Sequence, residues 1–553
     1  MPDEFTPENT VFVSLSFEGP DQYSQAGGLG VRVTELDTAL ALQGFETHLV
    51  FVGDPSLPGR EERVDGRLTL HRWGQWLSRD YPAGVYQGEE AKLRDYNDSA
   101  PWFVADSLLA PAIRAGKTAV VIAEEWHTAE ALCRLSDTLH GMGLRDRAVL
   151  MWNANNLYGF WRIDWDRLSF VSAITTVSKY MKHRMWAYGL DPLVIPNGIP
   201  ARFLDTPDDA DVAAVRAIFE GQITLFKIGR FDPDKRWLMA VESAAALRQR
   251  GEPVRLLMRG GIEPHGHEVM QRAWSLGLSV HDVRARSRDM ADCIAALREA
   301  PPADVLNLSF FLPEAFVRTL YRAADAVLAN SAHEPFGLVG LEVIGAGGTA
   351  VTGSTGEDYA VHLENAVVID TDDPNEIAED LLYLREHPAQ VERLRAGAAA
   401  TARQFTWDEV LHNLFAKTSY VAQRQGVRVL PPSSPPPVSW PDPPTAPPTA
   451  PPTASVSAAE PEPGTGTTSQ PEAEQTDAAL PDPIRTPTHA VTGESATPTA
   501  AEETAASAPA SGKATPPTPA SGMATPPTSA AEATAQAHED IRAQIDDGTE
   551  APA

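Results

Sequence analysis

Two glutamates, Glu334 and Glu342, stand in a segment that is otherwise mostly apolar or small, SAHEPFGLVGLEVIGAGG (331–348). From Gly337 onward this segment predicts a helix that is hydrophobic on every side and therefore belongs in a core. An unpaired carboxylate is costly to bury and tends to take up a proton. The pair therefore predicts a ligand rich in hydroxyl groups, such as a ribose with an attached sugar. A helix cap or an arginine partner is the alternative.

Two cations lie in another short segment, GRFDPDKRW (229–237). Arg230 and Lys235 fall between a predicted strand and the start of a predicted helix, where free N–H groups already favour a phosphate. Their formal charges could hold a diphosphate. The alternative is that both cations pair with Asp232 and Asp234 on a solvated turn.

Two features of the first half of the chain also suit a bound sugar phosphate. Gly27 and Gly28 in AGGLG (26–30) precede a predicted helix and would let backbone N–H groups approach an anion. His127 in EEWHTAEAL (124–132) follows a predicted strand and could hydrogen-bond a sugar hydroxyl, or it could be structural.

Two other kinds of site are not supported. The histidines of EPHGHE (263–268) are two positions apart in a Pro/Gly segment and share no helical face, so we expect no metal there. The chain also contains no G-x-S-x-G segment, so a hydrolase triad is unsupported.

The elements that would position these residues form two series of short apolar runs separated by helical patterns, which is typical of parallel sheets covered on both faces. Ligands in such sheets bind beyond the carboxyl ends of the strands. The first series predicts strands at 10–17, 47–53, 118–126, 147–154 and 172–178. The second predicts strands at 222–229, 254–260, 304–311, 325–331, 348–354 and 366–370.

We therefore predict two tandem Rossmann-like, doubly wound α/β domains that face a cleft. The expected bounds are 1–200 for the N-terminal domain, 201–405 for the C-terminal domain and 406–430 for a final crossover helix. Residues 431–553 are rich in Pro, Thr, Ala and Glu and contain no aromatic residue after Trp440. Such a segment buries too little apolar surface to fold, so we predict a disordered tail.

Charge and cysteine content limit the possible partners. The chain has a net charge of −30, and its tail holds 16 acidic against 3 basic residues, which leaves −17 on residues 1–430. This acidity argues against nucleic acid or an anionic membrane as the main partner. The two cysteines, Cys133 and Cys293, suggest neither a disulfide framework nor a cysteine metal site. No signal peptide and no apolar run long enough to span a membrane is present, so we expect a cytoplasmic protein.

Taken together, residues 10–425 resemble a retaining glycosyltransferase of the GT-B fold, close to family 4 and the glycogen (starch) synthases. The most specific segment is EPFGLVGLE, which carries the E-x7-E signature from Glu334 to Glu342. Supporting segments are AGGLG, EEWH, TTVSKYM (175–181), VIPNGI (194–199), IGRFDPDKRW (228–237) and FTWDEV (405–410).

The resemblance implies a hexosyltransferase that moves sugar from a nucleotide-diphosphate sugar to a carbohydrate or glycoconjugate acceptor. It implies catalytic roles for Arg230, Lys235, Glu334 and His127. It implies donor binding by Gly27, Gly28, Glu342, Gly337 and Leu338. It implies no metal and no cofactor, with the nucleotide sugar as co-substrate, and a final helix that packs back on the N-terminal domain.

The chain departs from the glycogen synthase pattern at three places. Gln25 and Ala26 replace the usual Lys-Thr before the paired glycines, Glu125 replaces the aspartate before Trp126 and His127, and only Gly356 of a later glycine pair is present. These departures bear on the donor and the acceptor more than on sugar transfer. A nucleotide-sugar epimerase and a non-catalytic nucleotide-sugar-binding scaffold remain open as alternatives, and the sequence leaves the oligomeric state open.

Overall fold

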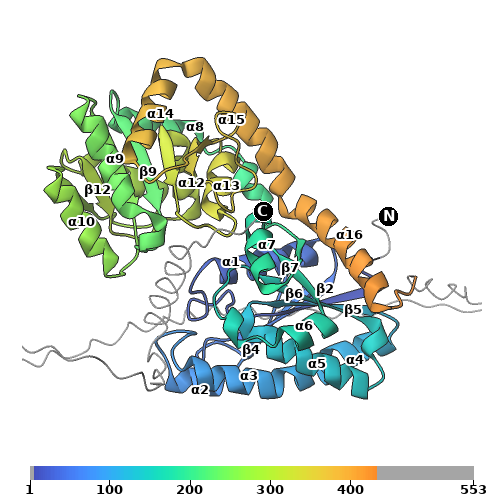
Figure 1. The fold of residues 1–553 in the computed structure, drawn as a ribbon. Helices are drawn as coiled ribbons and strands as arrows, with labels where there is room; N and C mark the ends of the chain where they lie inside the picture. The colour runs from blue at the N-terminus through green and yellow to red at the C-terminus, as the bar shows by residue number, and fades with distance from the viewer. Residues whose placement is uncertain (1–4, 432–553) are drawn as a thin grey trace, which may run out of the picture. The chain divides into compact units, whose positions relative to one another are not determined.

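The computed structural model describes residues 5–431, which form two α/β lobes, each built on its own sheet (Figure 1). We call the part built on β1–β8 the first lobe and the part built on β9–β15 the second lobe. The first sheet comprises β1 (Thr10–Leu15), β2 (Glu46–Val52), β3 (Arg60–Arg63), β4 (Leu68–Trp73), β5 (Thr118–Glu124), β6 (Ala148–Ala154), β7 (Ala173–Thr176) and β8 (Leu193–Val194). The second comprises β9 (Ile223–Ile228), β10 (Val254–Arg259), β11 (Val280–Val283), β12 (Val305–Leu308), β13 (Ala326–Ala329), β14 (Ala350–Thr352) and β15 (Val367–Val368).

Both sheets have the doubly wound order predicted from the sequence. The first runs β3-β4-β2-β1-β5-β6-β7-β8, and the second runs β11-β12-β10-β9-β13-β14-β15. Every pair is parallel except β3 with β4. The chain leaves β1 and β9 toward one side of the sheet and later returns to the other side with β5 and β13. The β1/β5 and β9/β13 junctions are therefore the topological switch points, where open α/β sheets bind ligands.

Helices cover both faces of each sheet. Their bounds are α1 (Gly28–Leu42), α2 (Gln75–Asp80), α3 (Glu89–Phe103), α4 (Ala110–Arg114), α5 (Ala129–Gly141), α6 (Trp165–Val171), α7 (Lys179–Met185), α8 (Asp209–Ile218), α9 (Trp237–Gln249), α10 (His265–Ser275), α11 (Met290–Glu299), α12 (Glu314–Ala323), α13 (Leu338–Gly345), α14 (Pro374–Glu386), α15 (Pro388–Ala402) and α16 (Trp407–Gln425).

Alternate residues of a strand point to opposite faces, and both faces of these strands are apolar. On β1, Phe12 packs with Leu36 of α1 and Leu411 of α16, whereas Val11 and Val13 belong to the core on the other face. On β9, Leu225 packs with residues of α9 and α14, whereas Phe226 packs with residues of α12 and α13. The continuous apolar strands of the sequence are therefore buried on both sides, as predicted.

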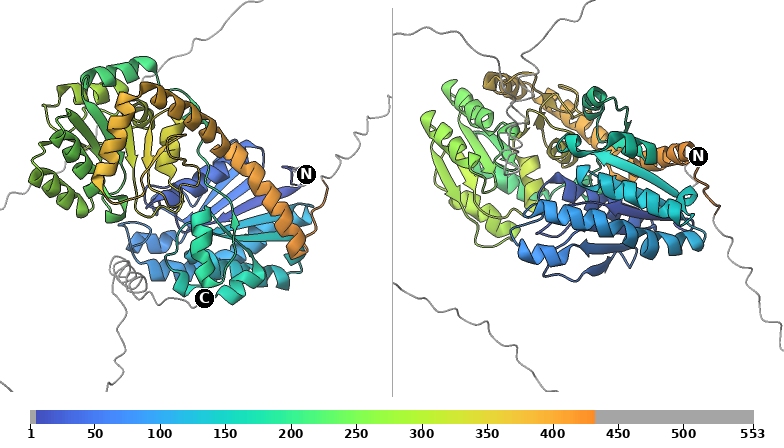
Figure 2. Two further views of the ribbon diagram at one scale, coloured as in Figure 1. Left: turned by 45° about the horizontal axis from the view of Figure 1, so that its top comes forward. Right: turned by 60° about the horizontal axis from the view of Figure 1, so that its bottom comes forward.

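The last helix, α16, leaves the second lobe and packs on the first (Figures 1 and 2). Trp407 and Phe415 join a core with Phe12 and Phe45 of the first lobe. Near the end of the helix, the Gln425 side chain accepts from the Leu150 amide at 3.0 Å and donates to the Leu150 carbonyl at 2.8 Å. In this structure α16 therefore runs from the second lobe back onto the first.

The structure also contains elements that the sequence did not predict. These are the strands β3, β4, β8 and β11. In addition, residues 263–268 were expected to form a loop, but α10 begins within them, at His265. Cys133 and Cys293 are both free and buried, in α5 and α11 as expected. The predicted tail lies outside the described residues, and the predicted bounds at 200, 405 and 430 stay predictions. Among residues 5–431, no helix is long and apolar enough to cross a bilayer.

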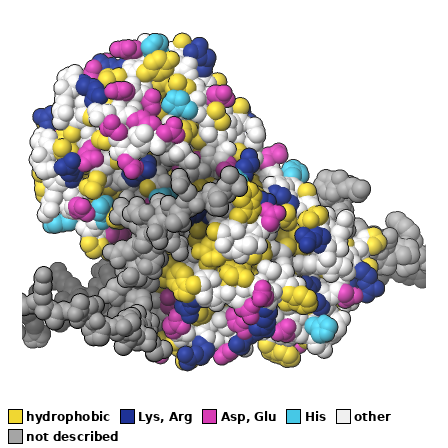
Figure 3. Space-filling model, in the orientation of Figure 1, with side chains coloured by type: hydrophobic (Ala, Val, Ile, Leu, Met, Phe, Trp, Pro, Cys, Tyr) yellow, Lys and Arg dark blue, Asp and Glu magenta, His cyan; other side chains and the backbone are white. Residues whose placement is uncertain are grey.

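Acidic and basic side chains are interspersed over the described part of the face shown in Figure 3. Over the described residues, acidic and basic side chains often pair with each other, as Arg134 does with Asp98 at 2.6 Å and Arg162 with Glu90 at 2.6 Å. A charged surface of this kind is well hydrated, and exposed ion pairs contribute little to the stability of the fold.

Candidate functional site

The switch point of the second lobe brings together a lysine and a glutamate that are 99 residues apart in the chain. Lys235 ends a short 3-10 turn after β9, and Glu334 lies in the connection from β13 to α13. Lys235 Nζ lies 2.6 Å from Glu334 Oε2, and both side chains are partly buried. The Ala332 amide also donates to the Asp234 carbonyl at 2.8 Å, which holds the two loops together.

A buried lysine that the sequence analysis missed fixes the strands below this pair. Lys227 of β9 donates from Nζ to the Leu328 carbonyl of β13 at 3.0 Å and to Asn330 Oδ1 at 2.6 Å. Burial lowers the pKa of Lys227 well below its usual value. Lys227 therefore ties β9 to β13 at the switch point. Its signal in the sequence was a single charged residue inside an apolar strand.

Arg230 lies in the same loop as Lys235 and is exposed. Among residues 5–431 its guanidinium has no hydrogen-bond or ion-pair partner, although its carbonyl accepts from Trp237 Nε1 at 2.6 Å. Asp232 instead accepts from the Asp234 amide, and Asp234 pairs with His333 at 3.2 Å. The alternative that these aspartates neutralise Arg230 and Lys235 is therefore wrong, and Arg230 is free to bind an anion.

Glu342 is the fifth residue of α13 and is partly buried. Its Oε2 accepts from the Tyr321 hydroxyl at 3.2 Å, and burial raises the pKa of its carboxyl to about 7. A cavity of about 110 Å³ lies against it, which has room for a few water molecules at about 30 Å³ each. Within the described part of the chain, the carboxylate neither caps its own helix nor pairs directly with an arginine, so it can accept a new donor.

This small cavity is lined by both lobes and by the connection between them. Leu338 belongs to its wall together with Glu342. Opposite them, Arg202 donates to Glu314 Oε1 at 2.9 Å and to Glu35 Oε1 at 2.8 Å. These three charged side chains also line the cavity. A ligand that reaches Glu342 must therefore meet this charged group.

Gly337 caps α13 with a left-handed backbone, φ 80°, which favours glycine. A side chain here would collide with Glu357, because an added Cβ would lie 2.5 Å from Glu357 Cγ. Tyr359 donates to the Gly337 carbonyl at 2.5 Å. Glu357 is buried, its Oε1 has no partner among the described residues, and burial together with Glu334 raises its pKa to about 7. The sequence analysis missed Glu357. After Glu334 and Glu342 it is the third carboxyl of this site, and it lies beside Glu334.

In the first lobe the glycine turn holds an internal carboxylate. Glu18, in the loop after β1, accepts with Oε2 from the backbone N–H groups of Ala26 at 3.2 Å, Gly27 at 3.0 Å and Gly30 at 3.1 Å. These amides do form the anion-binding turn that the glycines suggested, but in this structure Glu18 occupies it. Gly28 is exposed, and an added Cβ there would meet nothing within 4 Å. Its backbone is therefore open to a ligand.

His127 follows β5 at the switch point of the first lobe and is only 4% exposed. Its ring stacks on Phe17 with centroids 4.3 Å apart, and its Nε2 lies 2.7 Å from Glu89 Oε1. Its Nδ1 is buried and has no partner among the described residues. Burial lowers the pKa of His127. One ring nitrogen is therefore held by Glu89, and the other is buried without a partner among the described residues.

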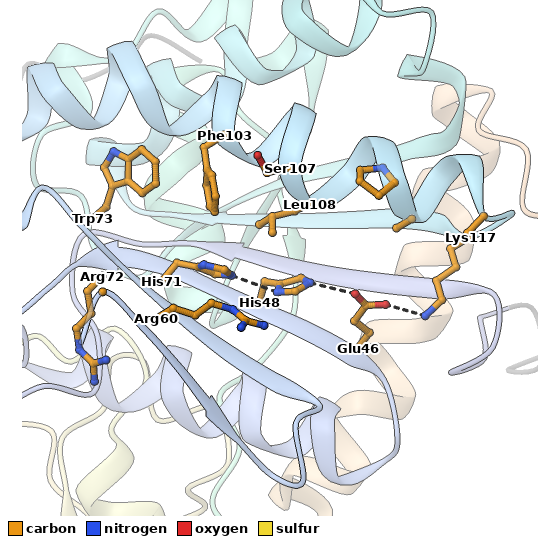
Figure 4. A pocket seen from close by; sticks show the side chains of 14 residues that line it. Glu46, His48, Arg60, His71, Arg72, Trp73, Phe103, Ser107, Leu108 and Lys117 are labelled. Atoms are coloured by element: carbon orange, nitrogen blue, oxygen red, sulfur yellow. Dashed lines mark hydrogen bonds and ion pairs between the residues drawn. The ribbon is translucent and has the colours of Figure 1, made fainter. Parts of the chain in front are cut away.

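Two further features lie away from the switch points. A cavity of about 700 Å³ in the first lobe is lined by a hydrogen-bonded row, Lys117–Glu46–His48–His71 (Figure 4). Glu46 begins β2 and Lys117 precedes β5, so this row starts at the amino ends of the strands, opposite the expected ligand edge. In α10, His265 pairs with Glu268 at 2.8 Å. Among the described residues, no group of three or more potential metal ligands lies together.

Comparison with known proteins agrees with this geometry. Residues 26–203 match the family model "Glycosyltransferase Family 4", and residues 208–402 match "Glycosyl transferases group 1". A D-inositol 3-phosphate glycosyltransferase of Geodermatophilus obscurus is 30% identical over 447 residues, covering 76% of this chain and 91% of the relative. The enzyme of the same name from Xylanimonas cellulosilytica is 25% identical and covers 73% of this chain and 94% of the relative.

Solved structures support the fold alone, because their sequence identity is low. Sucrose-phosphate synthase from Thermosynechococcus elongatus superposes with a TM-score of 0.55 at 17% identity, covering 75% of this chain and all of that chain. The catalytic domain of starch synthase IV from Arabidopsis thaliana, bound to ADP and acarbose, has a TM-score of 0.54 at 14% identity and covers 76% of this chain and all of that chain. With two doubly wound lobes, charged side chains at both switch points and relatives matched over nearly their full length, this chain belongs to the family 4 glycosyltransferases of the GT-B fold.

Proposed function

We propose that the protein transfers a hexosyl unit from a nucleotide-diphosphate sugar to a carbohydrate or glycoconjugate, with retention of the anomeric configuration and without a metal ion. The observation that carries this proposal is the contact of Lys235 with Glu334 at the β9/β13 switch point, with the Arg230 guanidinium in the same loop unpaired among residues 5–431. Cations beside a carboxylate at this edge suit a ligand that joins a diphosphate to a polyhydroxyl group.

The donor's parts match the groups on the second lobe. Arg230 and Lys235 hold the diphosphate, because each can donate charge-assisted hydrogen bonds to phosphate oxygens. Glu334 accepts from hydroxyls of the transferred sugar. Glu342 accepts from the ribose hydroxyls, which requires the charged side chains around its cavity to move. Gly337 and Leu338 form the turn under the nucleotide.

The first lobe completes the site from the other side. Gly27 and Gly28 bring backbone amides to the donor, and Glu18 must release the Gly27 amide before a phosphate oxygen can take it. His127 hydrogen-bonds the transferred sugar with the ring nitrogen that Glu89 leaves free. Its lowered pKa keeps the ring neutral near pH 7, so the ring adds no competing charge beside the cations.

In the transfer step, the bond between the anomeric carbon and the diphosphate oxygen breaks while a bond to the acceptor oxygen forms on the same face. The acceptor proton passes to the departing phosphate oxygen. Arg230 and Lys235 stabilise the negative charge that develops on this diphosphate, which is the main catalytic contribution of such a site. This charge is the one that a metal ion would otherwise neutralise.

A panel of nucleotide sugars tests the proposal. The measurement is release of nucleoside diphosphate with glucan, trehalose-type and lipid acceptors, each with and without a chelator. We expect one donor to react with an acceptor, an axial (α) anomeric product from an α-linked donor in the proton NMR spectrum, and no loss of rate with the chelator. Inverted product or abolition by the chelator would refute the mechanism. An epimer formed from donor alone, or binding without turnover, would refute transfer itself.

A further inference from the structure

A pocket of about 620 Å³ lies in the first lobe at the ligand-binding edge of its sheet. Its walls come from the loop after β1, from residues 54–55 just after β2, and from residues 82–87 after α2. The first two segments leave the sheet at the carboxyl ends of the parallel strands β1 and β2, and the third follows α2, which begins just after β4. The pocket therefore lies where a substrate of this lobe is expected, beside the glycine turn.

The pocket is lined by hydrogen-bonding groups without positive charge. Among the described residues that line it, none is Lys, Arg or His. Its polar side chains are Gln22, Tyr23, Gln25, Asp54, Tyr86 and Gln87. The side-chain amides of Gln22, Gln25 and Gln87 both donate and accept, which suits a ligand with many hydroxyl groups. The hydroxyls of Tyr23 and Tyr86 already donate to the Tyr81 carbonyl and to Glu18. A phosphate, in contrast, is bound by cations or by several free N–H groups.

A lysine that contacts three residues of the pocket lining is already engaged. Lys92 of α3 is buried and donates from Nζ to the Tyr23 hydroxyl at 2.6 Å, the Gly84 carbonyl at 2.9 Å and the Val85 carbonyl at 3.0 Å. An ammonium group has three N–H donors, so all of them are used. Burial lowers the pKa of Lys92 to about 8, which further weakens its pull on an anion at alkaline pH.

Tyr86 links this pocket to the site of the proposed reaction. Its hydroxyl donates to Glu18 Oε1 at 2.6 Å, and its ring centroid lies 5.7 Å from that of His127. In this structure Glu18 holds the amides of the glycine turn, and in the proposed reaction the released Gly27 amide serves the donor rather than an anion in the pocket. The carboxylate of Asp54, which lines the pocket, would also repel a phosphate.

We propose that this pocket binds the acceptor and that the acceptor is an uncharged polyhydroxyl compound, a sugar or polyol without a phosphate group. This inference rests on the proposed function. It separates the chain from the relatives named D-inositol 3-phosphate glycosyltransferase, although the fold is shared.

The test uses the full chain, its donor and two matched acceptor pairs. The pairs are myo-inositol with inositol 3-phosphate, and glucose with glucose 6-phosphate. We expect the uncharged member of at least one pair to give a kcat/KM about tenfold or more above its phosphorylated partner, the penalty expected when a charged group lacks its hydrogen-bond partner. Equal use of both members, or preference for the phosphorylated one, would overturn the inference.

A charge-adding variant identifies the pocket. Gln25→Lys places an ammonium group in the lining, so kcat/KM for the phosphorylated member should rise about tenfold relative to the uncharged one. Gln43→Lys adds the same charge beyond the other end of α1, about 22 Å away, and should leave the ratio unchanged. A ratio that Gln25→Lys does not move, or that both variants move equally, would place the acceptor elsewhere.

Nucleotide binding at the donor site distinguishes failure of the acceptor inference from failure of the proposed function. Binding of uridine and adenosine diphosphate is measured in parallel on the wild type and on Lys235→Ala. If nucleotide binding depends on Lys235 but neither member of either pair reacts or binds, the acceptor inference fails while the donor site stands. If no nucleotide binds, the proposed function itself fails.

Discussion

Replacing Arg230 by alanine removes a cation that the protein does not use to hold itself together. Its guanidinium is exposed and has no ion-pair or hydrogen-bond partner among the described residues. A surface change of this kind alters stability by about 0.5 kcal/mol or less. We therefore expect the melting temperature of Arg230→Ala to change by no more than about 2 °C.

The effect on catalysis should be much larger. Loss of one group that stabilises developing charge costs about 2.7–4 kcal/mol, and each 1.36 kcal/mol is about tenfold in rate. Because Arg230 is exposed, water screens part of its charge, so we expect the lower end of this range. The prediction is a kcat about a hundredfold below the wild type, measured as diphosphate release at saturating donor.

Arg236 supplies the matched control in the same loop. Its guanidinium is held by Asp372 at 2.6 Å. Its backbone φ of 48° is as unfavourable for alanine as it is for arginine. Arg236→Ala should lose a surface ion pair and change kcat by less than about threefold. A kcat of Arg230→Ala near the wild-type value, or an equal loss in both variants, would refute the diphosphate clamp.

Three further predictions concern Glu342, Glu125 and Trp407. If ionised Glu342 binds the ribose, the donor KM of the wild type should fall as pH rises through about 7, because the Glu342 carboxyl loses its proton there. Glu342→Gln should abolish this pH dependence. The same slope of KM against pH in the wild type and the variant would contradict the role. Burial raises the pKa of Glu125 to about 8, above its unfolded value, so its contribution to stability is present below about pH 4.5 and is lost as pH rises through 8. The free energy of unfolding should be measured by chemical denaturation at pH 5 and at pH 8.5. Between these two pH values it should fall less in Glu125→Gln than in the wild type, and an equal fall would exclude a neutral Glu125. Trp407→Ala should lower the unfolding free energy by about 3–5 kcal/mol, since the 4%-exposed ring packs α16 onto the first lobe; a loss below about 1 kcal/mol in urea would show that this contact is weak.

The sequence predicted those parts of the fold that depend on local pattern. Buried parallel strands such as β1 and β9 are continuous apolar runs, and α16 has a clear amphipathic period, so both were predicted. The strand β3 was missed because it lies at the edge of the sheet, where charged residues such as Arg60 and Glu62 leave no apolar pattern. The strand β4 is buried between β3 and β2, but His71 and Arg72 interrupt its apolar run. Likewise, β8 spans only Leu193–Val194, too short for any periodicity.

The candidate site shows the same limit. Arg230, Lys235 and Glu334 were predicted because each follows a predicted strand, and the parallel topology brings such positions to one edge. Glu18 was missed because its partners are backbone amides, and only the folded loop shows that its carboxylate reaches them. Glu357 was missed for a related reason, since its burial depends on the left-handed turn at Gly337 rather than on its neighbours in the chain.

A crystal of the full chain with bound uridine or adenosine diphosphate tests the central claim most directly. The account predicts phosphate oxygens within hydrogen-bonding distance of Arg230 and Lys235, and ribose hydroxyls on the Glu342 carboxylate. A nucleotide bound at another edge of either sheet, or bound with these three side chains turned away from it, would contradict the account.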